Sequence, residues 1–427
     1  MINIKKIRQS GVQFLLVLAS LTAMLGVSSV FAQSKPPIKI GFTMPLTGGL
    51  AGNGKAALLA MNIWKDDINA KGGLLGRPVD FVYYDDQTNP SLVLGLYTKL
   101  LESDKVDLIV SSYGTNMQVP PLPMVMQRKL YYLCLFGLNS NANFGYNGYF
   151  QMQPNGPDPA VDNTGTFFEA AMQASPRPKT VAIVGGDAEY PAMAMEGART
   201  NIQRLGLKIV YDKTYAPSTT DYAPIMRAIQ ATKPDIVMVA SYPPDSVGMI
   251  RAANEVGLKA QVFGGPMIGT AYASVKKQLG PLLNGVVGFE EYVPEPTIKF
   301  GGVEKFLERY QVAAVKEGVD PLGFYIPPFA YAMMQILSEA VEKTQGLDHQ
   351  KLIAYTHATT FKTYAGDIKF GANGEWAYPR SLYVQYRNIE GNDTDQFKKA
   401  GKQIILAPAQ FKSGNIISPY DPAASKK

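Results

Sequence analysis

Short apolar segments alternate with amphipathic helical patterns along most of the chain, and the links between them are short. The first unit runs from an apolar strand at 38–42 through a helix at about 55–70 to a second strand at 79–84. Apolar strands separated by amphipathic helices are typical of parallel sheets that carry helices on both faces. The pattern therefore predicts an α/β fold.

A second series of the same kind begins near Asp158. Each series is long enough to bury a core of its own, so the chain predicts two doubly wound parallel-sheet lobes. The segment 381–388 alternates in the manner of an edge strand. The strands predicted in the second series are 180–184, 207–211, 236–240, 261–263 and 285–289.

The loop 45–54, which follows the first strand, is rich in glycine and nearly matches a nucleotide-binding loop. Gly49, Gly54 and Lys55 have the required spacing, but Ala56 stands where a hydroxyl would bind magnesium. We therefore do not expect nucleotide hydrolysis or a nucleotide cofactor. In an open α/β sheet such a loop lies at the ligand-binding edge, where helix amino termini present free N–H groups.

The first 32 residues have the pattern of a cleavable signal peptide, with three basic residues, an apolar run at 12–27 and small residues before Ala32. A retained membrane anchor is the alternative. The formal charge is +6, and removal of the signal leaves +3 without a basic cluster. We therefore expect a soluble protein of the periplasm and no nucleic-acid partner.

No residue pattern nominates an enzyme or a metal site. His349 and His357 are eight residues apart, which does not fit a zinc motif. Cys134, the only cysteine, lies in an apolar strand and reads as a buried thiol rather than a nucleophile. We expect neither catalysis nor a cofactor or metal, and a periplasmic enzyme with an unrecognised site is the rival interpretation.

Several motifs together resemble the leucine/isoleucine/valine-binding proteins, which are the substrate-binding proteins of branched-chain amino acid ABC transporters. The resemblance covers essentially the whole chain after the signal. The motifs that carry it are Ile38-Lys39-Ile40-Gly41, Pro45-Leu46-Thr47-Gly48, Asn69-Ala70-Lys71-Gly72-Gly73, Tyr84-Asp85-Asp86-Gln87 and Val181-Ala182-Ile183-Val184 with Tyr190.

This resemblance implies the type I periplasmic binding protein fold, in which three crossovers join two lobes around a ligand cleft. Lobe 1 would comprise 36–156 plus 292–378, and lobe 2 would comprise 157–291 plus 380–427. The expected partners are a small-molecule ligand and an ABC permease of the inner membrane, which recognises the closed lobes of a monomer. A periplasmic ligand sensor of the same fold is an alternative.

The resemblance also implies where the ligand binds. The loop 50–54 would cover it, the ends of two strands in lobe 1 would bind its carboxylate and body, and lobe 2 would add two tyrosines. The candidate ligand-binding residues are Asn53, Tyr113, Gly114, Thr115, Asn116, Phe136, Leu138, Tyr190, Tyr242, Met267, Phe324 and Tyr325.

Met267 is the main departure from that family pattern, because an acidic residue that pairs with the α-ammonium group is expected at this place. A buried ammonium needs an anion or several acceptors, and methionine supplies neither. Phe136 and Leu138 make the site more apolar as well. We therefore expect a small aromatic or apolar carboxylate rather than an α-amino acid; a neutral amide or a branched-chain amino acid is the alternative.

Overall fold

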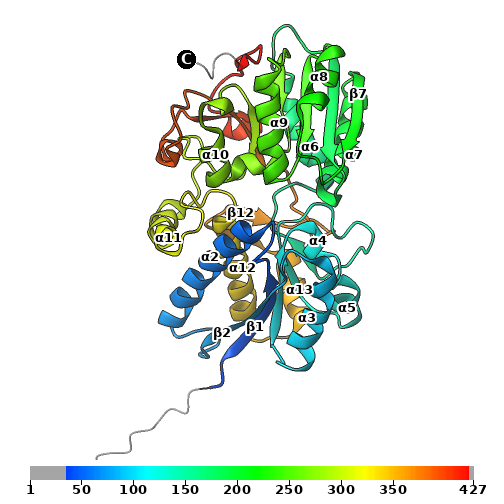
Figure 1. Cartoon of the computed structure of the whole chain (residues 1–427). Coiled ribbons are helices and arrows are strands. Elements are labelled where there is room, and N and C mark those ends of the chain that lie inside the picture. Colours follow the sequence, from blue (N-terminus) through cyan, green and yellow to red (C-terminus); the bar gives the residue numbers. More distant parts are fainter. Residues whose placement is uncertain (1–34, 423–427) are drawn as a thin grey trace, which may run out of the picture. The chain divides into compact units, whose positions relative to one another are not determined.

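The computed structural model describes residues 35–422, so the predicted signal peptide, residues 1–32, lies outside the described residues. A first sheet of five strands has the order β2-β1-β3-β4-β5, and its paired strands are all parallel (Figure 1). Its strands are β1 (Ile38–Met44), β2 (Val79–Asp85), β3 (Leu108–Tyr113), β4 (Tyr132–Leu135) and β5 (Tyr149–Gln151).

A second sheet of seven strands has the order β14-β13-β10-β9-β8-β6-β7. Its strands are parallel from β7 to β10, whereas β13 is antiparallel to both of its neighbours. Its strands are β6 (Thr180–Gly186), β7 (Lys208–Tyr215), β8 (Ile236–Ala240), β9 (Val262–Gly264), β10 (Val287–Glu290), β13 (Leu382–Tyr386) and β14 (Gln403–Ala407).

The prediction of an edge strand at 381–388 was wrong in one respect. The strand forms as β13, but β14 pairs with its free side and becomes the edge of the sheet. All five residues of β13 are buried, as an internal position requires. A small hairpin of β11 (Thr360–Thr363) and β12 (Gly366–Lys369) stands apart from both sheets.

Helices accompany the strands of both sheets. With the first sheet lie α2 (Ala51–Ala70), α3 (Pro90–Glu102), α4 (Thr115–Gln118), α5 (Leu122–Gln127), α11 (Val303–Glu317), α12 (Pro327–Thr344) and α13 (His349–Ala358). With the second sheet lie α6 (Pro159–Ala171), α7 (Glu189–Arg204), α8 (Ala223–Ala231), α9 (Pro243–Glu255), α10 (Ala273–Leu279) and the 3-10 turns η1 (Ile268–Ala271), η2 (Gly280–Leu283), η3 (Thr394–Lys398) and η4 (Ala409–Phe411).

Local sequence signals explain where the helices start and stop. Asn89 caps α3, since its side chain accepts a hydrogen bond of 3.0 Å from the Ser91 N–H, and Pro90 occupies the first turn. At the end of α2, the Gly73 N–H donates to the Ile68 carbonyl at 2.9 Å, as in a common helix carboxyl-terminal cap.

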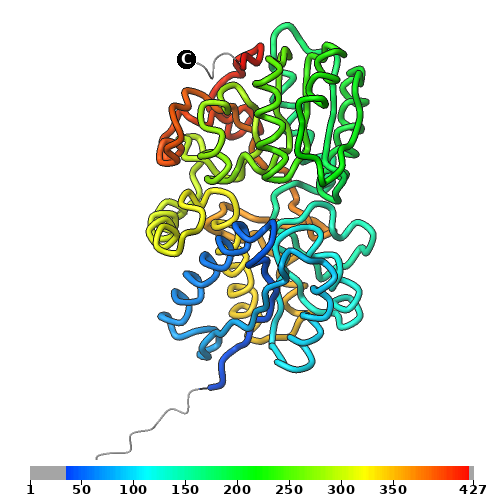
Figure 2. Tube along the Cα trace, viewed as in Figure 1, coloured from blue at the N-terminus to red at the C-terminus, as the bar shows by residue number. Residues whose placement is uncertain are grey.

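The chain passes three times between the two sheets, after β5, after β10 and before β13. In Figure 2 the blue and cyan segments therefore share one half with the yellow and orange ones, and the green segments share the other half with the red ones. This arrangement confirms the predicted fold of two doubly wound lobes. The precise lobe limits, 36–156 plus 292–378 and 157–291 plus 380–427, stay a prediction.

Candidate functional site

Close packing explains Gly54, which follows the loop between β1 and α2. The helix begins at Ala51, four residues earlier than predicted. A Cβ atom on Gly54 would lie 2.1 Å from the Pro45 carbonyl oxygen, so only glycine lets the helix approach the strand so closely. Lys55 is exposed and Ala56 is buried. Backbone packing therefore explains Gly54, one of the residues behind the near match to a nucleotide-binding loop.

Asp85, at the end of β2, fixes this loop against the sheet. Its carboxylate accepts hydrogen bonds from the Leu46 N–H at 2.9 Å and from the Thr47 hydroxyl at 2.7 Å. Burial raises the pKa of Asp85, but the bonds from Thr47 and from the backbone of Gln87 and Leu46 outweigh it, and the pKa falls below its usual value. Asp85 of the Tyr84-Asp85-Asp86-Gln87 motif thus has a structural role, because it holds this loop in place.

A small cavity of about 20 Å³ lies where residues from both sheets meet. The lining residues end strands or begin helices, as expected for ligand sites in open α/β sheets. They are Leu50, Tyr113, Gly114, Thr115, Phe136, Gly137, Gln153, Tyr190, Tyr242, Ile268 and Tyr325.

Three tyrosine hydroxyls meet beside this cavity. The Tyr113 hydroxyl, at the end of β3, lies 3.2 Å from that of Tyr272 and 3.3 Å from that of Tyr325. Tyr272 immediately precedes α10, which lies with the second sheet, and Tyr325 precedes α12, which lies with the first. The Tyr113–Tyr272 hydrogen bond therefore connects the first half of the protein to the second. Burial raises the pKa of all three tyrosines, and each is therefore a neutral donor and acceptor.

The other polar groups at the cavity are hydroxyls and amides. The Thr115 hydroxyl accepts a hydrogen bond of 2.9 Å from the Leu138 N–H, and the Tyr190 hydroxyl donates to the Pro266 carbonyl at 3.2 Å. Gln153, two residues after the end of β5, lines the cavity. No aspartate, glutamate, lysine, arginine or histidine belongs to the lining of this cavity as the described residues form it.

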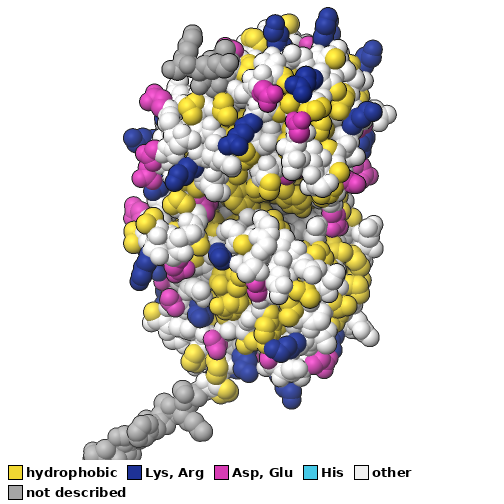
Figure 3. Space-filling view, viewed as in Figure 1, with side chains coloured by type: hydrophobic (Ala, Val, Ile, Leu, Met, Phe, Trp, Pro, Cys, Tyr) yellow, Lys and Arg dark blue, Asp and Glu magenta, His cyan; other side chains and the backbone are white. Residues whose placement is uncertain are grey.

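A larger cavity of about 480 Å³ adjoins the small one. Leu50 and Tyr242 line both cavities, so these two side chains stand between them. The larger cavity holds two carboxylates, the exposed Asp187 and Asp245, which accepts a hydrogen bond of 2.6 Å from the Tyr215 hydroxyl. Figure 3 shows hydrophobic side chains gathered along the boundary between the two halves on this face.

The structure brings most of the predicted site residues together. Tyr113, Gly114, Thr115, Phe136, Tyr190, Tyr242 and Tyr325 line the small cavity, and Asn116 lines the larger one. Asn53, Leu138, Met267 and Phe324 are buried but line neither cavity. The role of all twelve in ligand binding stays a prediction.

Ile268, next to Met267, reaches the small cavity in its place. Sequence analysis also missed Gln153 and Tyr272. The position of Gln153 just beyond a strand could have indicated a site residue. The strand itself, β5, has only three residues and therefore shows no alternation from which to predict it. Tyr272 lies in a short link between η1 and α10, and no periodic pattern marks it.

The remaining reactive side chains have structural surroundings. His349 Nδ1 accepts a hydrogen bond of 3.0 Å from the Tyr131 N–H, and burial lowers the pKa of His349. Cys134 is buried, and burial raises the pKa of its thiol well above the usual value. Within residues 35–422, no three His, Cys, Asp or Glu side chains come together as metal ligands would, and no helix has the length and apolarity to cross a membrane.

Two doubly wound halves linked by three crossings, with cavities bordered by both, define the class of two-lobed ligand-binding proteins. The sequence profile of the periplasmic binding proteins matches residues 37–386, and the chain belongs to this family. It is a periplasmic binding protein of the ABC transporter type.

Known relatives agree with this family and with the fold. A Leu/Ile/Val-binding protein homologue of Brucella abortus is 23 % identical over 385 residues, covering 88 % of this chain and 94 % of the relative. A branched-chain amino acid transporter substrate-binding protein of Streptococcus pneumoniae, solved with isoleucine, has a TM-score of 0.72 at 17 % identity and covers 87 % of this chain and 100 % of its own. A solute-binding protein of R. palustris, solved with benzoate, has a TM-score of 0.71 at 18 % identity, covering 89 % and 99 %.

Proposed function

We propose that this protein is the periplasmic substrate-binding component of an ABC importer and that it captures a small aromatic or apolar carboxylate between its lobes. The observation that carries the ligand class is the lining of the small cavity, which has aromatic rings, hydroxyls and an amide but no charged side chain. An α-ammonium group buried there would lack an anionic partner, at a large cost in free energy.

The cavity favours a carboxylate attached to an apolar body. Tyr113, Phe136 and Tyr325 offer ring surface, while Gln153 and the tyrosine hydroxyls offer donors. The benzoate bound by the R. palustris protein belongs to this chemical class, on a similar fold.

Entry of such a ligand requires movement. A cavity of about 20 Å³ has room for little more than one water molecule. Leu50 and Tyr242 separate it from the cavity of about 480 Å³, a volume in the usual range of ligand pockets. We therefore propose that the ligand enters with the lobes apart and that closure brings Leu50 and Tyr242 over it.

A branched-chain amino acid is the second candidate ligand, and one observation favours it. Asp187 and Asp245 line the larger cavity, so an ammonium group bound there, rather than in the small cavity, would find carboxylates. The isoleucine of the S. pneumoniae relative belongs to this class.

Calorimetry with benzoate, 4-hydroxybenzoate, leucine, isoleucine and leucinamide distinguishes these candidates. We expect benzoate-type acids to bind with micromolar Kd, about 8 kcal/mol, and the amino acids not to bind. Leucine binding without benzoate binding would overturn the proposed ligand class. If none of these compounds binds, native mass spectrometry can identify the molecule that co-purifies with the protein. The proposal stands only if that molecule is an apolar carboxylate.

Tyr242→Ala should remove most of the binding heat, whereas Tyr242→Phe, which keeps the ring, should keep most of it. Thr115→Ala should also weaken binding, but it leaves the Leu138 N–H without its acceptor and so lowers stability by about 1–3 kcal/mol. Thr115→Ser restores the hydroxyl and is the matched control. Unchanged affinity in both alanine variants would place the ligand elsewhere.

The role in import needs a separate measurement. Deletion of the gene should abolish uptake of the bound compound, because the permease would lose its binding protein. A sensor of the same fold would leave uptake intact and change gene expression instead. Light scattering on the purified protein tests whether it is a monomer, and Edman sequencing of the exported protein tests cleavage after Ala32.

A further inference from the structure

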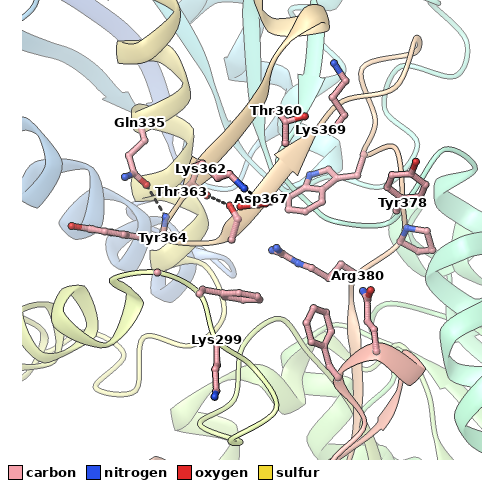
Figure 4. Close-up of a pocket in the computed structure, with 17 residues that line it drawn as sticks. Lys299, Gln335, Thr360, Lys362, Thr363, Tyr364, Asp367, Lys369, Tyr378 and Arg380 are labelled. Atoms are coloured by element: carbon pink, nitrogen blue, oxygen red, sulfur yellow. Dashed lines mark hydrogen bonds and ion pairs between the residues drawn. The ribbon is translucent and has the colours of Figure 1, made fainter.

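A second and larger cavity lies away from the ligand cleft. It has a volume of about 780 Å³ and is bounded by the β11–β12 hairpin, the loop 299–301, the segment 376–380 and η4 (Figure 4). It shares no lining residue with the cavities around Tyr242. We call it the Arg380 pocket.

Positive charge dominates the Arg380 pocket. Lys299, Lys362, Lys369 and Arg380 line it, and Asp367 is the one carboxylate among its lining residues, so three positive charges are in excess. Lys362 forms an ion pair with Asp367, and Lys369 Nζ donates to the His357 carbonyl at 2.6 Å. These contacts leave the charge of Lys299, Lys369 and Arg380 without a paired carboxylate in the described part of the chain.

Arg380 is the group that most needs an anion. It is 7 % exposed, and its Nη2 has no hydrogen-bond partner among the described residues. Burial lowers the pKa of its guanidinium to about 9, although Glu291 and Asp367 act to raise it. The buried Glu291 supplies part of the counter-charge, but no carboxylate among the described residues forms an ion pair with Arg380, and a buried Nη2 without an acceptor is costly.

The surroundings of Arg380 hold its planar group ready. The guanidinium carbon lies 4.4 Å from the centre of the Trp376 ring and 4.5 Å from that of Phe300, so aromatic rings cover the guanidinium. A Cβ atom on Gly366 would lie 2.6 Å from Nη1, so glycine at this position leaves the guanidinium its space. Figure 4 shows the guanidinium directed toward Asp367 in the middle of the pocket's side chains.

Two further features indicate an aromatic or planar ligand. Trp376 Nε1 is a second buried donor without a partner within residues 35–422, and both it and Arg380 Nη2 are shielded from solvent, so a ligand reaches them only after neighbouring side chains move. Tyr378, at the rim, is 77 % exposed, so its ring is open to contact with a ligand. Together the pocket offers unpaired donors, excess positive charge and rings.

We propose that the Arg380 pocket is a second binding site, separate from the ligand cleft, for a small aromatic anion with two carboxylates. One carboxylate binds the edge of the Arg380 guanidinium and the Trp376 Nε1–H. The other is stabilised by Lys299 and Lys369, and the ring of the ligand lies against Tyr378. Planar carboxylates match the fork of an arginine, which can donate two parallel hydrogen bonds.

The test is calorimetry on Tyr242→Ala, in which the cleft should bind aromatic acids only weakly, with phthalate, an aromatic dicarboxylate, together with benzoate and inorganic phosphate. We expect saturable phthalate binding, weaker binding of benzoate because it carries one charge, and still weaker binding of phosphate because it has no ring. Equal binding of phosphate would overturn the aromatic part of the proposal. Absence of saturable phthalate binding at millimolar concentration would overturn the site.

Three variants assign the binding to this pocket. Arg380→Gln should weaken phthalate binding more than tenfold, since a hydrogen bond to a charged group contributes about 1.5–3 kcal/mol. Asp367→Asn should tighten it, and Lys362→Ala should weaken it. The last two residues are exposed, so their variants give an answer even where Arg380→Gln fails to fold. Unchanged affinity in both would overturn the assignment.

Tryptophan fluorescence gives an independent readout. The chain has two tryptophans, so Trp64→Phe leaves Trp376 as the sole reporter. Phthalate should change the emission of Trp376 in a saturable way. Adding the Tyr242→Ala substitution to the Trp64→Phe variant should leave that change unaltered. Loss of the signal with Tyr242→Ala would place phthalate in the cleft and contradict a second site. The proposed function of the cleft is not affected by either outcome.

Discussion

Replacement of Tyr272 by phenylalanine should shift the protein toward states with the lobes apart. The Tyr272 hydroxyl lies 3.2 Å from that of Tyr113, and this contact joins the end of β3 in the first sheet to the start of α10 beside the second. The substitution removes this contact and keeps the ring, which packs 5.3 Å from the Tyr325 ring.

The size of the effect follows from the geometry. A neutral hydrogen bond contributes about 0.5–1.5 kcal/mol net. A hydroxyl pair at 3.2 Å is longer than the usual O–H···O bond, so we expect the lower half of that range, about 0.5–1 kcal/mol. This corresponds to a change of roughly two- to fivefold in the equilibrium between joined and separated lobes, and to the same loss of affinity for any ligand that needs the joined state.

A distance measurement between the lobes tests this prediction. Val312 on α11 is 77 % exposed and the Arg227 side chain on α8 is 60 % exposed, so both positions accept a cysteine and a fluorophore. The natural Cys134 is buried, and its raised thiol pKa keeps it unreactive. Single-molecule energy transfer should show a larger population at long distance in Tyr272→Phe than in the natural protein.

Tyr97→Phe is the matched control. The Tyr97 hydroxyl donates to the Val110 carbonyl at 2.6 Å, so this substitution also removes a buried tyrosine hydrogen bond, but one between α3 and β3 of the same half. It should lower stability without moving the distance distribution. Identical distributions for Tyr272→Phe and the natural protein would refute the reasoning that this hydroxyl pair holds the lobes together.

Two further substitutions test the interior. Glu375→Gln should become increasingly more stable than the natural protein as the pH rises from about 5 to about 8. Burial raises the pKa of Glu375, so the folded state keeps a proton that the unfolded chain releases near pH 4.3, and the natural protein loses stability as the pH rises. A difference in unfolding free energy between the two proteins that does not grow with pH would contradict this. Gly54→Ala should cost about 1–3 kcal/mol because its Cβ atom would meet the Pro45 carbonyl at 2.1 Å, whereas Gly52→Ala, with open space around it in the same helix, should be neutral or stabilising in the same denaturant titrations.

The sequence was sufficient for the architecture but not for every strand. Long apolar strands such as β1 and β6 have seven residues each, and their alternation with helices predicts a doubly wound fold. β5 has three residues, too few for any period to appear. β14 becomes the edge of the second sheet only because it pairs with β13, and pairing between such segments is set by tertiary contacts that a local pattern does not contain.

The candidate site divides in the same way. Tyr113 ends a strand, and Phe136 and Tyr242 follow strands, so the rule that ligands bind beyond the carboxyl ends of parallel strands was enough to find them. Whether Met267 or Ile268 faces the cavity depends on how the chain turns into η1. A local sequence pattern does not fix that turn to within one residue, and Ile268 is the residue that lines the cavity. Neither residue is acidic, so the expectation about the α-ammonium group does not depend on this detail.

Leu50 and Tyr242 connect ligand selection to lobe movement. Because they separate a cavity of about 20 Å³ from one of about 480 Å³, no ring-sized ligand reaches the inner site without displacing them. Leu50 comes from the first half and Tyr242 from the second, so separation of the halves would move the two side chains apart. A ligand can shift this equilibrium only by its difference in affinity for the two arrangements. An apolar carboxylate that packs on both side chains would gain that difference from the same contacts that select it.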